Sequence, residues 1–120
     1  MRQSGGLGMM QKDNRTIAFV CTGNTCRSPM AEAIFNDMAE KNGVCVRAES
    51  FGIATSTGLP VSENSVIACK EIGIDLSGKA STAVADAGIE KYEKFYCMSQ
   101  SHAKMLMQFF LVQPLSLIHI

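Results

Sequence analysis

The segment CTGNTCRSP at residues 21–29 constrains the fold of this chain more than any other feature. The apolar run at 17–20 precedes it and predicts a buried strand. Pro29 is expected to open a helix, and Met30, Ala33, Ile34 and Met38 then recur at helical spacing. A tight loop between a strand and a helix N-terminus surrounds an anion with backbone N–H groups. The segment therefore predicts a phosphate-binding loop.

The residue types in this loop are those that phosphoryl transfer requires. Cys21 stands where the helix field favours a thiolate, which makes it the candidate nucleophile. Arg27 offers a planar fork for two phosphoryl oxygens, and Ser28 can donate to the Cys21 sulfur. Gly23 permits a sharp turn, while Asn24 tolerates a positive φ and can pin the loop by side-chain hydrogen bonds. We expect a phosphocysteine intermediate that water hydrolyses.

Strand and helix patterns alternate along the rest of the chain. This alternation predicts an α/β fold with a parallel sheet. The expected elements are a strand at 44–49, helices at 59–71 and 82–87, a strand at 94–98 and a helix at 101–110.

Composition narrows the partners and the compartment. The 120 residues carry a formal net charge of zero, so neither nucleic acid nor a membrane is an expected partner. Five cysteines without a secretory signal favour free thiols in the cytoplasm. Cys21 and Cys26 lack a second pair at ligand spacing, so we expect no metal and no cofactor. Cys45, Cys69 and Cys97 are expected to pack as small apolar side chains, and His102 to lie on the surface.

From Phe19 to Glu32 the sequence resembles the low-molecular-weight protein-tyrosine phosphatase family, which includes bacterial protein-arginine phosphatases. The likeness continues at 47–52, 73–77 and 96–98 and covers roughly Ile17 to Met107. It implies a three-layer α/β/α fold with four parallel strands and no metal. The implied substrate is a phosphorylated protein or a small phosphomonoester.

Carried over by position, the resemblance makes Cys21 the nucleophile and Arg27 the phosphate ligand. Asn24, Ser28 and Ser50 would brace the loop, although Ser50 also reads as an ordinary loop serine. The segment 22–26 (Thr22, Gly23, Asn24, Thr25, Cys26) would surround the substrate.

Two residues of the loop bear on substrate and redox behaviour. The resemblance implies that Thr25 favours phosphoarginine over phosphotyrosine as the substrate. The alternative is that Thr25 is only a small side chain that fills space in the loop. Cys26 would form a reversible disulfide with Cys21, or pack as a small buried hydrophobe.

Two departures from the family pattern affect the predicted activity. Lys79 stands where relatives place a histidine that braces the loop, which puts that network in doubt. The family's general acid is an Asp before a Pro, but no such pair occurs here and the last aspartate is Asp86. We expect a chain that stops before this acid, the last strand and the final helix. General acid catalysis is worth about 10²–10⁴-fold, so turnover should be impaired.

The predicted organisation has three parts. Residues 1–14 form a disordered leader, residues 15–113 the truncated phosphatase domain, and residues 114–120 a non-native tail. The tail resembles translated sequencing adaptor, and a genuine apolar strand is the alternative. Two other functions stay open: an arsenate reductase of the same fold, which the lack of cysteines at 77–88 disfavours, and a non-catalytic oxyanion-binding or redox-thiol fragment.

Overall fold

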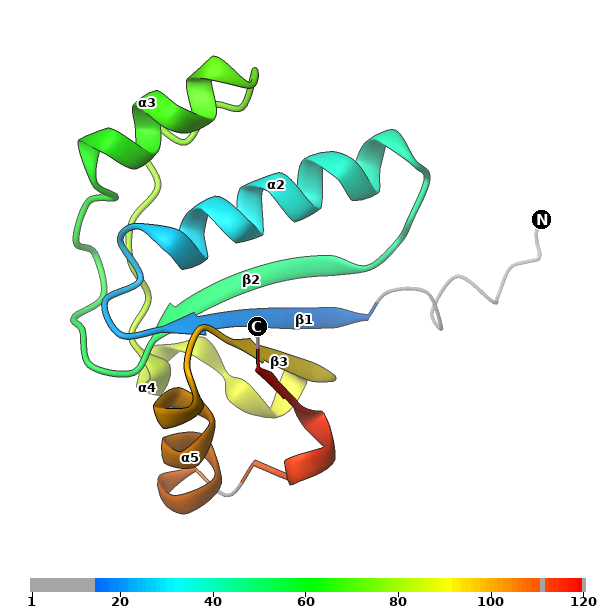
Figure 1. The fold of residues 1–120 in the computed structure, drawn as a ribbon, viewed down its shortest axis with the longest axis vertical. Coiled ribbons are helices and arrows are strands. Elements are labelled where there is room, and N and C mark those ends of the chain that lie inside the picture. Colours follow the sequence, from blue (N-terminus) through cyan, green and yellow to red (C-terminus); the bar gives the residue numbers. More distant parts are fainter. Residues whose placement is uncertain (1–14, 111, 120) are drawn as a thin grey trace.

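A computed structural model describes residues 15–110 and 112–119 of the chain. Its centre is a four-stranded parallel sheet in the order β2-β1-β3-β4 (Figure 1). The strands are β1 (Thr16–Cys21), β2 (Arg47–Gly52), β3 (Lys94–Cys97) and β4 (Leu117–His119). Because all four run in the same direction, their carboxyl ends lie along one edge of the sheet, where α/β proteins bind ligands.

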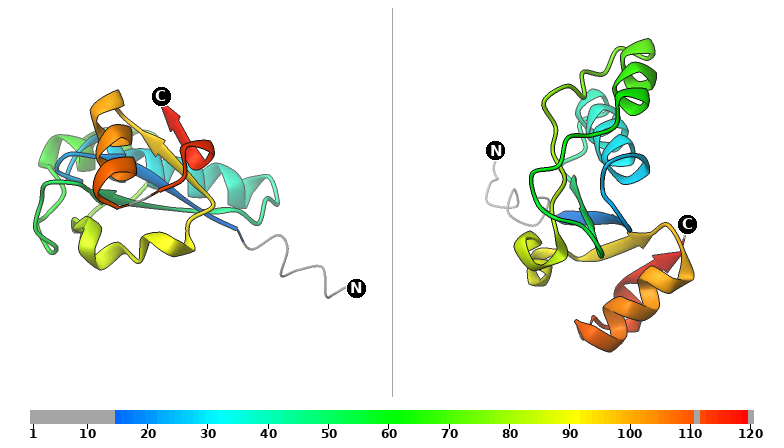
Figure 2. Two further views of the ribbon diagram at one scale, coloured as in Figure 1. Left: turned by 90° about the horizontal axis from the view of Figure 1, so that it is seen from below. Right: turned by 90° about the vertical axis from the view of Figure 1, so that its left-hand side faces the viewer.

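Helices lie on both faces of this sheet (Figure 2). On one face, α2 (Arg27–Lys41) packs along β1 and β2, and α3 (Glu63–Glu71) packs against α2. On the other face lie α4 (Val84–Ala87) and α5 (Gln100–Phe109). Short 3₁₀ turns, η1 (Ile89–Lys91) and η2 (Pro114–Ser116), precede β3 and β4. The predicted three-layer α/β fold is confirmed.

Alternation along the strands divides the core between the two faces. Ala18 and Val20 of β1 point toward α4 and α5, where they join the larger cluster. The other members of that cluster are Phe51, Ala87, Tyr92, Phe95, Cys97 and Leu106. A smaller cluster of Val61, Cys69 and Leu76 lies between α2 and α3. Cys69 and Cys97 are buried as expected, whereas Cys45 is exposed.

Several predicted boundaries were wrong. Helix α2 begins at Arg27, with Pro29 inside its first turn, and Met38 of the predicted apolar stripe is 58% exposed. Strand β2 runs from Arg47 to Gly52 because a turn and extended residues occupy 42–46. Helix α3 begins four residues after the predicted start, since the Ser62 side chain caps it by accepting from the Ser65 N–H.

The end of the described chain corrects a further expectation. Leu117 to His119 pair in parallel with Phe95 to Cys97, so a fourth strand is present where we expected none. That residues 114–120 are a non-native tail stays a prediction. The predicted disordered leader at 1–14 lies outside the described residues. Within the described part of the chain, no helix is long and apolar enough to cross a membrane.

Candidate active site

The predicted phosphate-binding loop connects the carboxyl end of β1 to the N-terminus of α2. It surrounds a small cavity of about 130 Å³, lined by residues 21–27. The N-cap residue Cys26 makes no side-chain cap, and the first turn of α2 contains no acidic residue. The N–H groups of this turn, which lack intrahelical partners, therefore remain available to an anion.

Cys21 lies at the base of this cavity with its sulfur held by two groups. Its side chain is buried, and Sγ accepts a hydrogen bond from the backbone N–H of Asn24 at 3.1 Å. The Ser28 hydroxyl lies 2.8 Å from the same sulfur. Both contacts suit a thiolate, which accepts hydrogen bonds and donates none.

Asn24 organises the loop through both its backbone and its side chain. Its φ is 57°, the only positive value at a described non-glycine residue. The Nδ2 group donates to Ser28 Oγ at 2.8 Å and to Ser50 Oγ at 2.9 Å, while Oδ1 accepts from the Thr82 N–H at 2.7 Å. These bonds use both hydrogens and the carbonyl of a buried amide, which fixes its orientation.

Ser50 extends the network away from the cavity. Sheet register places it beside Phe19 on the face that carries α2. Its hydroxyl donates to Glu32 Oε1 at 2.6 Å, and Lys79 Nζ contacts Glu32 Oε2 at 2.8 Å. Lys79 thus stands in the network, although it reaches Asn24 only through Glu32 and Ser50.

His102 was wrongly expected on the surface. It is 6% exposed, and its Nε2 lies 2.9 Å from Thr22 Oγ1. Ring Nδ1 is buried without a hydrogen-bond partner in the described part of the chain. Burial, and then the positive charge of Arg27, lower the pKa of His102 below its ordinary value. Its position in the first turn of α5 offered no sequence signal for this contact.

The other predicted residues lie on the rim of the cavity. Arg27 is exposed and lines the cavity, and its guanidinium makes no hydrogen bond or ion pair within the described residues, so its donors are available to a ligand. Thr25 is half-buried and accepts from the Ser62 N–H through its carbonyl oxygen at 2.7 Å. Cys26 is an exposed free thiol that accepts from Ser65 Oγ at 3.3 Å, so it is not the small buried hydrophobe of the alternative interpretation.

Glycine is required at a position that the sequence did not single out. A Cβ added to Gly52 would meet the Thr22 carbonyl oxygen at 2.7 Å and Asn24 Cβ at 3.1 Å, so the loop lies directly against β2. Gly23, by contrast, has no positive φ, and an added Cβ would make only an ordinary contact of 3.7 Å with Thr25. The sharp turn therefore depends on Asn24 and not on Gly23.

Comparison with protein families shows to which family the chain belongs. The family described as low molecular weight phosphotyrosine protein phosphatase matches residues 16–115. This chain belongs to that family. Among the described residues of this family member, no group of three or more His, Cys, Asp or Glu side chains could hold a metal ion.

Individual relatives show how far the likeness extends. A protein-arginine-phosphatase of Bacillus subtilis (strain 168) is 37% identical over 90 residues, which are 75% of this chain and 59% of that protein. An arsenate reductase of Brevibacillus brevis (strain 47) is 40% identical over 73 residues, covering 61% of this chain and 50% of that protein. The chain thus spans less than two thirds of the length of either relative.

A solved structure of the family matches the fold closely. It is the YwlE arginine phosphatase, in a cysteine-to-serine mutant with a phosphorylated active-site serine. The TM-score is 0.81 at 32% identity, and the match covers 87% of this chain and 68% of that one.

Proposed function

We propose that this chain carries the nucleophile and phosphate cradle of a cysteine-dependent protein phosphatase that acts on phosphotyrosine or phosphoarginine. The observation that carries the proposal is the environment of Cys21 Sγ, which the Asn24 N–H and the Ser28 hydroxyl contact at the base of a cavity rimmed by Arg27. The YwlE arginine phosphatase mutant, in which a phosphorylated active-site serine replaces a cysteine, supports the same chemistry.

The reaction proceeds in two displacements. Cys21 Sγ attacks phosphorus, an S–P bond forms, and the P–O or P–N bond breaks with its electron pair leaving on the substrate. Water then attacks phosphorus, and the electron pair of the S–P bond returns to sulfur. Ser28 stabilises the departing thiolate by donating to it, and Arg27 with the loop N–H groups stabilises the equatorial oxygens.

Within the described residues, no aspartate or glutamate lines the phosphate cavity to donate a proton to the leaving group. Asp86, the last aspartate, accepts from Thr57 Oγ1 at 2.6 Å and lies outside the phosphate cavity. We therefore propose that phosphocysteine forms readily from aryl phosphates, whose leaving groups need little protonation, and slowly from substrates with basic leaving groups.

The test compares wild type with Cys21→Ser on phosphotyrosyl and phosphoarginyl peptides and on an aryl phosphate. We expect release of phosphate only from the wild type, with a phosphorylated Cys21 peptide found by mass spectrometry after acid quenching. Equal phosphate release by Cys21→Ser would remove the nucleophile assignment.

Thr25 is the residue that we propose for substrate choice. Its side chain lines the phosphate cavity and makes no hydrogen bond within the described residues, so its hydroxyl can face a guanidinium N–H. We expect Thr25→Ile to lower phosphoarginyl turnover relative to phosphotyrosyl turnover. An unchanged ratio of the two activities would end the arginine preference.

A further inference from the structure

A side-chain contact joins α5 to the phosphate loop from the face of the sheet opposite α2 (Figure 1). His102 Nε2 lies 2.9 Å from Thr22 Oγ1, although the two residues are 80 positions apart in the sequence. Their surroundings differ, since His102 is buried in the first turn of α5 whereas Thr22 is exposed and lines the phosphate cavity. The proposed two-step chemistry assigns no role to either side chain.

We propose that the Thr22 hydroxyl donates a hydrogen bond to a phosphoryl oxygen of the bound substrate, and that His102 is the positioning residue that directs the hydroxyl hydrogen there. The inference rests on the proposed function, because it assumes that the cavity lined by residues 21–27 binds a phosphoryl group. A threonine hydroxyl suits this role, since it has one hydrogen and two lone pairs and can accept from one partner while it donates to another.

The ring of His102 is neutral in the folded chain. Burial, and then the positive charge of Arg27, lower the pKa of His102. Its position in the first turn of α5 acts in the same direction, because a helix N-terminus carries partial positive charge. A neutral imidazole carries one hydrogen, so one ring nitrogen donates and the other can only accept.

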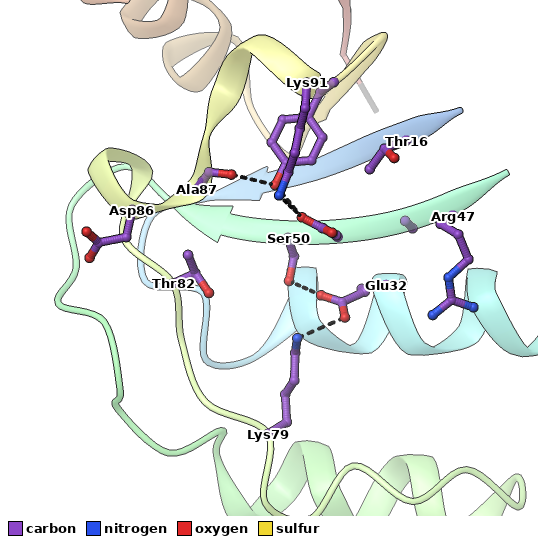
Figure 3. A pocket seen from close by; sticks show the side chains of 12 residues that line it. Thr16, Glu32, Arg47, Ser50, Lys79, Thr82, Asp86, Ala87 and Lys91 are labelled. Carbon is purple, nitrogen blue, oxygen red and sulfur yellow. Dashed lines mark hydrogen bonds and ion pairs between the residues drawn. The ribbon is translucent and has the colours of Figure 1, made fainter. Parts of the chain in front are cut away.

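The carboxylates behind the loop are engaged elsewhere. Glu32 contacts Lys79 Nζ at 2.8 Å and Glu49 contacts Lys91 Nζ at 2.9 Å, both in a larger cavity of about 520 Å³ at the outer edge of β2 (Figure 3). His102 does not line that cavity. Within the described residues, the ring of this histidine therefore has no carboxylate partner that would favour its charged form.

The surroundings of the two ring nitrogens decide which one carries the hydrogen. Nδ1 is buried and has no hydrogen-bond partner within the described residues. A hydrogen on Nδ1 would leave a buried donor unpaired, and unpaired buried N–H groups are rarer in proteins than unpaired acceptors. A hydrogen on Nε2 is instead donated to Thr22 Oγ1. The favoured tautomer therefore makes His102 the donor and Thr22 the acceptor of this bond.

This tautomer leaves the hydrogen of the Thr22 hydroxyl without a partner. The hydroxyl makes no second hydrogen bond among the described residues, and its hydrogen cannot point at Nε2, which already carries one. The backbone of Thr22 is held on the opposite side, since its carbonyl oxygen accepts from the Ala54 N–H at 3.0 Å. The hydroxyl hydrogen is consequently available to an oxyanion in the cavity that Thr22 lines. Hydrogen bonds to charged acceptors are the stronger class in proteins.

Nitrogen-15 NMR of the histidine ring in the full chain tests the tautomer. At slightly alkaline pH we expect a protonated Nε2 and an unprotonated Nδ1 for His102, both with and without inorganic phosphate. The spectrum of His102→Gln distinguishes these signals from those of the second histidine, His119. The opposite tautomer would overturn the inference, because Thr22 would then donate its hydrogen to Nε2.

Protection of Cys21 from iodoacetamide by inorganic phosphate, resolved by peptide, measures binding at the same pH. We expect Thr22→Val to raise the phosphate concentration for half-protection about tenfold, as loss of a hydrogen bond to a charged group would. Thr22→Ser keeps the hydroxyl and should stay near the wild type. His102→Leu should raise that concentration only about threefold, because the hydroxyl remains but rotates freely. His102→Gln can present an Nε2 donor and should restore most of the protection.

A double variant separates positioning from a general structural effect. Because His102 acts through the Thr22 hydroxyl, His102→Leu should change phosphate protection no further in a Thr22→Val background. Additive effects of the two substitutions would overturn the positioning role. Gln108→Ala, at an exposed position in the same helix, is the matched control and should leave protection unchanged. Alkylation of the buried Cys69 and Cys97 reports loss of the fold.

Failure of this inference is distinguishable from failure of the proposed function. A folded Thr22→Val protein with wild-type phosphate protection would overturn the inference alone. If His102→Leu unfolds, the tautomer and the Thr22→Val protein decide. A wild type in which phosphate fails to protect Cys21 would instead overturn the proposed function, and this inference with it.

Discussion

The Thr22 carbonyl oxygen passes so close to β2 that Gly52 has no room for a side chain. Register pairs Gly52 with Cys21, so the loop and the strand end meet at the position of the proposed nucleophile. Ser50, two residues earlier on the same strand, accepts from Asn24 Nδ2 of the loop. One short strand therefore supplies both a close approach and a hydrogen bond to the catalytic loop.

Gly52→Ala should displace the loop and lower stability. The added Cβ would overlap backbone, which cannot rotate away, so we expect a loss of about 1–3 kcal/mol in unfolding free energy. Phosphate protection of Cys21 should weaken as well. Urea unfolding measures the first effect, and Gly23→Ala is the matched comparison, with a smaller loss of unfolding free energy. Equal losses in the two variants would contradict this account.

His102 should make stability depend on pH. Its folded pKa lies below the ordinary value, so the unfolded chain binds the extra proton first as the pH falls. The contribution of His102 to the free energy of unfolding is therefore present above about pH 6.5. It is lost as the pH falls through the lower pKa of the folded state. Urea unfolding of wild type and His102→Gln across this window measures the effect. We expect a smaller pH slope in the variant, and identical slopes would refute the assignment.

Helix α3 is tied to the phosphate loop through its first turn. Ser62 accepts from the Ser65 N–H and donates to Ser65 Oγ, which in turn donates to Cys26 Sγ. The Ser62 N–H also donates to the Thr25 carbonyl oxygen. Ser62 therefore both caps α3 and supports the phosphate loop.

Removing the cap should weaken this element measurably. We expect Ser62→Ala to lower the unfolding free energy by about 1 kcal/mol, as is typical for loss of a serine N-cap. Thermal or urea unfolding checks the value. Asn64→Ala, at an exposed position in the same helix, should be neutral or slightly stabilising because alanine is the better helix former. A similar loss in both variants would show that the cap is not the cause.

Element boundaries show where periodicity fails as a guide. The run from Val44 to Glu49 alternates like a strand, yet β2 begins only at Arg47, where its N–H finds the Arg15 carbonyl oxygen. Its outer edge is partly occupied by the Asn36 side chain, which bonds both the N–H and the carbonyl of Ala48. These hydrogen-bond partners of β2 come from other elements, so no local sequence pattern predicts them.

At the scale of the whole molecule, the fourth strand covers one edge of β3. Pairing of Leu117 to His119 satisfies backbone groups that would otherwise face solvent. Deleting residues 114–120 should expose that edge and promote self-association. Light scattering across a concentration series checks this, and a monomeric deletion variant at all concentrations would contradict it.

The residues of the candidate site fall into two groups: those within one loop and those that contact it from distant parts of the chain. Cys21, Asn24, Arg27 and Ser28 were recognisable because they lie within one loop whose residue types and spacing suit phosphate. Glu32 and His102 were not singled out, and Lys79 was noted only as a departure that put the network in doubt. Their contacts to Ser50, Thr22 and each other span 18 to 80 residues.

The sequence by itself determined the strand, the phosphate-binding loop and the helix that follows, because local spacing and backbone preference decide those features. Only the tertiary structure decided what stands behind the loop. Parallel strands in register bring Gly52 and Ser50 beside Cys21 and Asn24, and helix packing adds Glu32. The CTGNTCRSP loop supplies the groups that we propose to bind phosphate, while contacts from distant segments hold those groups in place.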